Sequence, residues 1–224
     1  MIIQDTHRKS VASQTFTQRS CSIDAEDMRY IASLLRNNYS DTILATMREI
    51  IANALDVSQG KKPDVILPTK LSPNFIVRDY GVGLSKEDML GLYTKYGKST
   101  KRSSNSNIGG FGIGRFAPLS YTSSFIVSSV FEGWKTSYSI RIDDNNDTVV
   151  TEILSEESNE ANGIFVSVPI ANQDIDSFHK KFAFFAFYLY GKLNLKNFTS
   201  SNKEEYLKAN RLVEVMSNEV FDMF

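Results

Sequence analysis

The segment from Asp41 to Val57, with the sequence DTILATMREIIANALDV, decides how the fold is interpreted. Its apolar residues recur with a helical period around most of the circumference, which predicts a buried helix rather than a surface helix. Ser40 can cap the start of this helix, and Gly60 and Pro63 can terminate it.

Three polar side chains, Glu49, Asn53 and Asp56, stand at positions i, i+4 and i+7 of this helix. This spacing places them on one narrow stripe. A buried row of two carboxylates and an amide is costly unless a partner satisfies it. A magnesium ion with water is a suitable partner, because an Asn oxygen can ligate the ion while a Glu deprotonates water. A solvated polar face explains the same stripe equally well when the helix is taken alone.

A second motif, RDYGVGL, runs from Arg78 to Leu84 and follows a predicted strand directly. An acid at a strand end, Asp79, can accept a hydrogen bond from an exocyclic amine such as that of adenine. Gly81 and Gly83 let a flat ligand approach the backbone. A type I′ or type II turn preceded by a polar residue is the alternative interpretation.

A third motif, NIGGFGIGRF, spans Asn107 to Phe116. Its four glycines expose consecutive backbone N–H groups, and a helix starting near Arg115 would direct its positive end to the same place. The motif therefore predicts an anion site that suits a phosphate chain. It closes a segment from Lys95 to Gly114 that lacks apolar periodicity, and loops of this length inside a domain are usually functional. We interpret this segment as a lid.

Other patterns predict a mostly antiparallel sheet in the middle of the chain. Strands are expected at 65–67, 75–78, 125–130, 134–142, 149–154 and 164–168, with a hairpin turn at 143–147 and an edge strand at 13–17. Helices are expected at 25–36, after a capping box at 85–88, at 174–190 and at 203–215. Phe125, Trp134 and Tyr138 are expected in the core of the sheet.

The composition excludes several functional classes. The chain has 224 residues, of which 42% are hydrophobic, so it can bury a core. Its 25 basic and 26 acidic residues give a net charge of -1, so no overall field attracts nucleic acid or anionic lipid. One cysteine and two histidines are too few for a disulfide framework or a Cys/His metal centre. We find no signal peptide and no membrane-spanning segment, and expect a cytoplasmic protein.

The three motifs together, in this order and at these separations, resemble those of the gyrase, heat-shock chaperone, histidine kinase and MutL (GHKL) ATPase superfamily. The resemblance implies the Bergerat fold, an α/β two-layer sandwich in which helices cover one face of a mixed, mostly antiparallel sheet. ATP lies between the helix layer and a lid in this fold. The resemblance also implies an ATPase that binds ATP and Mg²⁺, hydrolyses ATP slowly and couples hydrolysis to lid closure.

The resemblance assigns a role to each motif. Glu49 resembles the general base, Asn53 the Mg²⁺ ligand and Asp79 the adenine contact. The remaining nucleotide-binding residues that it implies are Asp56, Gly81 and Gly83, the lid element Ser99, Thr100 and Lys101, and the phosphate loop Gly109, Gly110, Phe111, Gly112, Ile113 and Gly114. The chain departs from the superfamily at the late Gly-Thr pair, which is Gly163-Ile164 here. Thr122 or Ser167 is a candidate to supply the missing hydroxyl.

Within the superfamily, the chain resembles the phage rIIA-like rapid-lysis protein family. The shared stretches include FIVRDYG at 75–81 and IGGFGIG at 108–114, and the likeness covers roughly Met1 to Leu189. Members of that family are longer, so we interpret the chain as an N-terminal fragment. An ATP-binding domain is expected at 1–172, with a C-terminal helical extension at 173–224 that leads toward a downstream domain.

A nonenzymatic function is the alternative. The Gly163-Ile164 departure and the aromatic run from Phe178 to Tyr190 also fit a nucleotide-gated module for dimerisation or for recruitment of a protein partner. Simple core packing explains the aromatic run as well. Both interpretations include nucleotide as a ligand, and a homodimer that forms on ATP binding is compatible with each.

Overall fold

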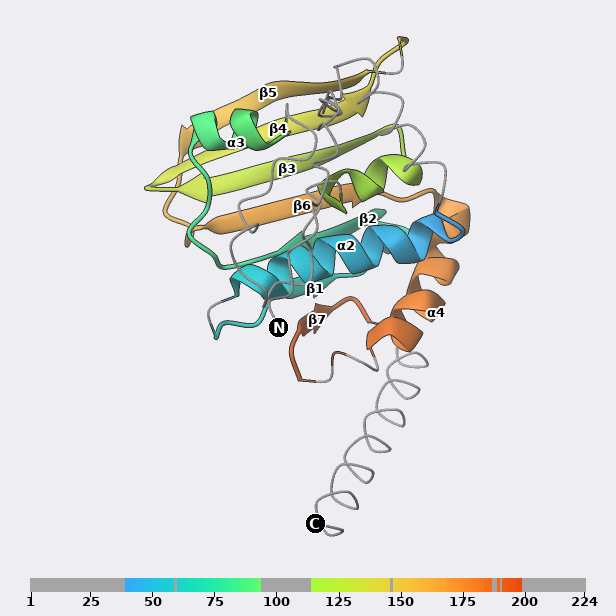
Figure 1. Cartoon of the computed structure of the whole chain (residues 1–224). Helices are drawn as coiled ribbons and strands as arrows, with labels where there is room; N and C mark the ends of the chain where they lie inside the picture. Colours follow the sequence, from blue (N-terminus) through green and yellow to red (C-terminus); the bar gives the residue numbers. More distant parts are fainter. Residues whose placement is uncertain are drawn as a thin grey trace, which may run out of the picture.

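The computed structural model describes residues 39–58, 60–93, 114–145, 147–186, 189 and 191–198. The strand expected at 13–17, the helices expected at 25–36 and 203–215, and all of the expected lid except Gly114 lie outside the described residues. The described part forms one seven-stranded sheet with helices packed on it (Figure 1).

The sheet has the strand order β5-β4-β3-β6-β2-β1-β7. Its strands are β1 (Asp64–Ile66), β2 (Asn74–Arg78), β3 (Ser124–Phe131), β4 (Trp134–Ile142), β5 (Thr148–Glu157), β6 (Gly163–Pro169) and β7 (Asn194–Lys196). All neighbouring strands are antiparallel except β1 and β7, which are parallel. This confirms the expected mixed, mostly antiparallel sheet.

Helices gather on one face of this sheet, as Figure 1 shows for α2 and α4. The helical elements are α2 (Thr42–Val57), α3 (Lys86–Tyr93), α4 (Ile175–Ala186) and the 3-10 helices η1 (Gly114–Ser120) and η2 (Asn172–Asp174). Because the helices bury one face of the sheet, the described chain is the two-layer α/β sandwich that the sequence predicts.

The core lies between α2, α4 and the inner face of the sheet. Met47 and Ile51 of α2 are fully buried in one cluster with Phe75 of β2 and Phe178 of α4. The rings of Phe75 and Phe178 lie 5.8 Å apart. Alternation along β2 therefore sends every second side chain into the helix layer, as a half-covered sheet requires.

The sheet core contains two of the three aromatic residues expected there. Phe125 and Tyr138 are buried, but Trp134 is 51% exposed, so the expectation for Trp134 was wrong. Trp134 is the first residue of β4 and pairs with the last residue of β3 at the hairpin end. A periodic pattern identifies the inward face of a strand but does not show where along the strand the helix cover ends.

The start of α2 also differs from the expectation. The helix begins at Thr42, and its cap is Asp41 rather than Ser40. Asp41 Oδ1 accepts the N–H of Leu44 at 3.0 Å, and Lys181 of α4 contacts Asp41 Oδ2 at 2.7 Å. The residue that caps α2 therefore also links α2 to α4.

Two expected turns are confirmed. Ser85 Oγ accepts the N–H of Asp88 at 3.1 Å and donates to its carboxylate at 2.7 Å, which is the expected capping box at the start of α3. Asp143 accepts the N–H groups of Asn145 and Asp147 and closes the hairpin between β4 and β5.

Among the described helices, none is long and apolar enough to cross a bilayer.

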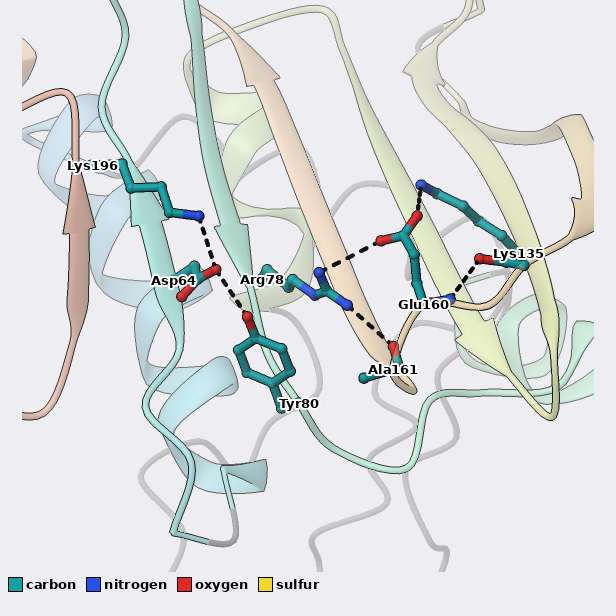
Figure 2. Close-up of polar contacts among 8 residues, drawn as sticks. Asp64, Arg78, Tyr80, Lys135, Glu160, Ala161 and Lys196 are labelled. Carbon is teal, nitrogen blue, oxygen red and sulfur yellow. Dashed lines mark hydrogen bonds and ion pairs between the residues drawn. The ribbon is translucent and has the colours of Figure 1, made fainter.

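Strand β7, which the sequence did not predict, is attached to the sheet through Asp64. This carboxylate is 8% exposed and accepts hydrogen bonds from Tyr80 Oη at 2.9 Å and Lys196 Nζ at 3.3 Å (Figure 2). It also accepts a hydrogen bond from Asn194 Nδ2 at 3.1 Å. Burial by itself raises the pKa of Asp64, but hydrogen bonds from Asn194, Tyr80 and Lys196 outweigh it and lower the pKa below its usual value. The ionised form of Asp64 therefore stabilises the β1–β7 pairing.

We expect this stabilisation to depend on pH. Because the folded-state pKa of Asp64 is depressed, its contribution is complete above about pH 4 and is lost as the pH falls through the folded-state pKa. Asp64→Asn should lower the free energy of unfolding by about 2 kcal/mol at pH 7, and the difference from wild type should shrink toward pH 2. Urea unfolding across this range measures it, with exposed Asp144→Asn as the control. A difference that does not change with pH would contradict the assignment.

Candidate functional site

The polar stripe of α2 runs between two glycine-containing turns. A Cβ atom on Gly114 would lie 2.1 Å from Glu49 Oε2, so Gly114 is in direct contact with this carboxylate. At the C-terminal end of the helix, a Cβ on Gly81 would lie 3.2 Å from the side chain of Val57. Glu49 and Asp56 are seven residues apart, which separates them by about 10 Å along the helix axis.

Asp79 is held rigidly at the end of β2. It is 7% exposed, and its Oδ1 accepts the N–H of Gly81 at 2.9 Å and the N–H of Ile164 at 3.0 Å. The N–H of Asp79 donates to the carbonyl of Ile164 at 2.9 Å. These three bonds fix both the backbone and the side chain, so the orientation of the carboxylate is set before any ligand arrives.

Gly163 allows β6 to approach Asp79 this closely. A Cβ on Gly163 would lie 2.3 Å from the Asp79 carbonyl oxygen and 3.2 Å from its Oδ1, and the residue has a φ of 145°. No side chain fits at this position. A glycine at the start of a predicted strand was the only signal in the sequence, and the pairing of β2 with β6 is what reveals the contact.

The departure at Ile164 therefore leaves the main-chain anchoring of Asp79 in place. Neither of the two candidate hydroxyls, those of Thr122 and Ser167, replaces the missing threonine hydroxyl beside Asp79. Ser167 shares the outer face of β6 with Phe165, which is opposite to the face that Ile164 and Val166 present to the core. Thr122 donates its hydroxyl hydrogen to the carbonyl of Ser124 at 3.2 Å.

The turn after Asp79 is fastened to β3. Gly83 has a φ of 76°, and a Cβ there would lie 2.1 Å from the carbonyl oxygen of Val130. The hydroxyl of Ser129 accepts the N–H of Leu84 and donates to the Leu84 carbonyl, both at 2.8 Å. The second glycine of the motif is thus required by the close approach of β3.

Glu49 has a neighbour that sequence reasoning missed. Arg48 Nη2 lies 3.0 Å from Glu49 Oε1, while Oε2 is the oxygen that faces Gly114. The Arg48 side chain is 55% exposed and that of Glu49 is 25% exposed, so the pair lies at the edge of the site. A guanidinium fork of this kind restricts the orientation of a carboxylate more than it stabilises the fold.

The segments on either side of residues 94–113 are held together by aromatic contact. Tyr93, the last residue of α3, packs edge-on against Phe116 of η1 with the ring centroids 5.8 Å apart. Burial raises the pKa of Tyr93 to about 12, with the positive charge of Arg115 opposing and the negative charge of Asp79 adding to the shift. Tyr93 is therefore neutral, and its ring joins the end of α3 to η1.

The structure thus places the described members of the predicted set around α2. Glu49, Asn53 and Asp56 lie on the helix, Gly114 touches its middle, and Asp79 and Gly81 lie at its end. The remaining predicted residues, Ser99, Thr100, Lys101, Gly109, Gly110, Phe111, Gly112 and Ile113, lie outside the described residues. The helix expected near Arg115 is the seven-residue 3-10 helix η1, which contains Pro118.

The described side chains suit Mg²⁺ only if a bound phosphate ligand supplies further oxygen atoms. Among the described residues, no group of three or more His, Cys, Asp or Glu side chains could hold a metal ion. Mg²⁺ commonly uses few protein ligands and completes its shell with water and substrate phosphates. One amide oxygen from Asn53, beside the glycine-lined contact at Glu49, is compatible with this mode of binding.

Comparison with known proteins gives one family. The sequence profile described as histidine kinase-, DNA gyrase B-, and HSP90-like ATPase matches residues 42–175. No curated protein matches the chain significantly. The matched range begins with the first residue of α2 and ends with the first residue of α4, so it contains both ends of the site described above.

A pair of glycine variants tests the close contact at Asp79. Gly163→Ala should destabilise the fold by about 3 kcal/mol or more, because it adds a collision with the Asp79 backbone to an unfavourable φ. Gly133→Ala is the matched control, since its φ is 81° but nothing lies within 4 Å, and it should cost about 1 kcal/mol. Thermal and urea unfolding measure both. Equal losses would show that the contact is not tight.

Proposed function

Because this chain belongs to the histidine kinase-, DNA gyrase B- and HSP90-like ATPase family, we propose that its site binds ATP with Mg²⁺ and hydrolyses the terminal phosphate slowly. One observation carries the proposal: a single buried helix connects a glycine-lined carboxylate, Glu49, to the turn that follows a fixed acid, Asp79. A nucleotide has a base at one end and phosphates at the other, and this arrangement matches both ends.

At the base end, Asp79 accepts a hydrogen bond from the exocyclic amine of adenine. The two N–H groups bound to Oδ1 hold the carboxylate in place, so little ordering is required when the base binds. Gly81 leaves room for a flat ring beside the helix end, and Gly83 keeps the turn against β3.

At the phosphate end, Glu49 is the general base that takes a proton from the attacking water. Its Oε2 lies against Gly114, which is the last glycine of the phosphate loop. Asn53 would hold the magnesium ion, and Asp56 lies one turn farther toward the base. When bound, Mg²⁺ neutralises charge on the phosphates. Ser99, Thr100, Lys101 and the glycines from 109 to 112 complete the cradle in this proposal.

Closure of the lid from Lys95 to Asn107 over the nucleotide is the proposed conformational output. The contact between Tyr93 and Phe116 supports this, because it joins the two described segments from which the lid extends. The proposal also includes an ATP-binding domain at 1–172, a helical extension at 173–224, and a homodimer that forms on ATP binding.

The shared stretches at 75–81 and 108–114 support membership of the phage rIIA-like family. The single cysteine supports a cytoplasmic location.

The adenine contact has a direct test. Asp79→Asn should weaken ATP binding at least about tenfold, because the amide group replaces an acceptor with a donor. Asp143→Asn is the matched control, since Asp143 also accepts two backbone N–H groups but lies in the β4–β5 turn. Calorimetric titration with ATP and Mg²⁺ measures both variants. Equal affinity of Asp79→Asn and wild type would exclude Asp79 as the base contact.

The hydrolytic role requires a separate variant. Glu49→Gln should still bind ATP but should hydrolyse it about 100-fold more slowly, because the general base is lost. Glu152→Gln is the control, since Glu152 also forms an ion pair, with Lys86 at 2.9 Å, but lies on β5. Phosphate release under single-turnover conditions gives the rates. ATP binding by wild type without any hydrolysis would favour the nonenzymatic nucleotide-gated module instead.

A further inference from the structure

The outer face of the sheet, which the described helices leave uncovered, carries a row of alternating cations and aromatic rings. The row consists of Lys61, Tyr80, Arg78, Phe165 and Lys135, and we call it the outer ladder. The Arg78 guanidinium lies 4.7 Å from the centre of the Tyr80 ring and 4.3 Å from that of Phe165. Arg78 is therefore held between two rings in the middle of the row.

Arg78 and Lys135 together hold the turn that precedes β6. Arg78 Nη2 donates to the carbonyl of Ala161 at 3.2 Å, and its Nη1 lies 3.5 Å from Glu160 Oε2. Lys135 Nζ binds the other oxygen of Glu160 at 2.6 Å (Figure 2). The side chains of Arg78 and Lys135 are 19% and 25% exposed, so this is a half-buried network rather than an isolated surface pair.

The clamped turn leads directly to the contact that fixes Asp79. Two residues after Ala161, Gly163 touches the Asp79 backbone, and the next residue, Ile164, binds Asp79 through its N–H and carbonyl groups. Arg78 and Asp79 are neighbours in sequence and point to opposite faces at the end of β2. Arg78 therefore holds this turn from the outer face of the sheet, and the residues that follow the turn position Asp79 on the inner face.

We propose that Arg78 is a positioning residue for the Asp79 carboxylate, so that the outer ladder sets the base selectivity of a site on the other face of the sheet. The inference rests on the proposed function, in which Asp79 binds adenine. Only an arginine provides both a planar surface between two rings and separate donors for Ala161 and Glu160. Loss of Arg78 releases the turn and lets the Ile164 N–H move away from Asp79.

Base selectivity distinguishes this role from a merely structural one. ITP carries the same triphosphate as ATP but has a carbonyl in place of the exocyclic amine. Arg78→Met should raise the Kd for ATP about tenfold and should change the Kd for ITP less than about twofold, so the preference for ATP narrows. Arg78→Lys should restore part of the preference, because it returns the charge near Glu160 without the fork.

Two further variants serve as controls. Lys196→Met breaks an ion pair on the same face, with Asp64 at 3.3 Å, and should leave the ATP-to-ITP ratio unchanged. Glu160→Gln should weaken ATP binding, and its effect should not add to that of Arg78→Met, because both act on one turn.

Amide hydrogen exchange tests the same link without nucleotide. The Ile164 amide should exchange about tenfold faster in Arg78→Met, while the Leu84 amide, which binds Ser129, should keep its wild-type rate. An ATP preference that survives in Arg78→Met, equal weakening of ATP and ITP, or an unchanged Ile164 amide would each overturn this inference alone. Wild type that binds neither nucleotide would contradict the proposed function and this inference with it.

Discussion

The contact between Asp79 and the start of β6 is the constraint on which the site depends. Two strands meet here with no side chain between them, because Gly163 presents only hydrogen to the Asp79 carbonyl. Backbone groups of Gly81 and Ile164 then satisfy one oxygen of a carboxylate that is 7% exposed. A buried acid is costly unless its acceptors are satisfied in this way, so the orientation of the Asp79 carboxylate and the pairing of β2 with β6 are inseparable.

The central helix gives the site its length. Its buried side carries Met47 and Ile51, each fully removed from solvent, and burial of such side chains contributes about 1.5–3 kcal/mol each. This packing fixes α2 against the sheet. The polar stripe on its other side is then carried to fixed positions, with Glu49 at Gly114 and the helix end at Gly81. Core stability and site geometry therefore come from opposite sides of one helix.

The two faces of the sheet have different chemistry and are connected through the ends of its strands. The inner face is apolar and covered by helices, whereas the outer face holds Asp64, Arg78 and Glu160 in ion pairs. Side chains alternate along a strand, so neighbours such as Arg78 and Asp79 serve different faces. The charge network on the outer face therefore holds the turn that leads to the Asp79 contact on the other side of the strand.

Local sequence determined most of the helices and strands, and it also predicted the candidate site residues on α2 and in the turn after β2. Helical periodicity predicted α2 to within one residue at its start, and alternation predicted most of the sheet, because both patterns reflect burial of one side of an element. The spacing of Glu49, Asn53 and Asp56 on one stripe also follows from helix geometry alone. Tertiary structure decided what depends on contacts between distant segments: the parallel pairing of β7, the exposure of Trp134 and the Arg78 clamp on Ala161. It also decided which glycines are indispensable, since the need for Gly163 and Gly114 arises only where β2 meets β6 and where α2 meets η1. No local pattern encodes such contacts, because their partners lie tens of residues away in the chain.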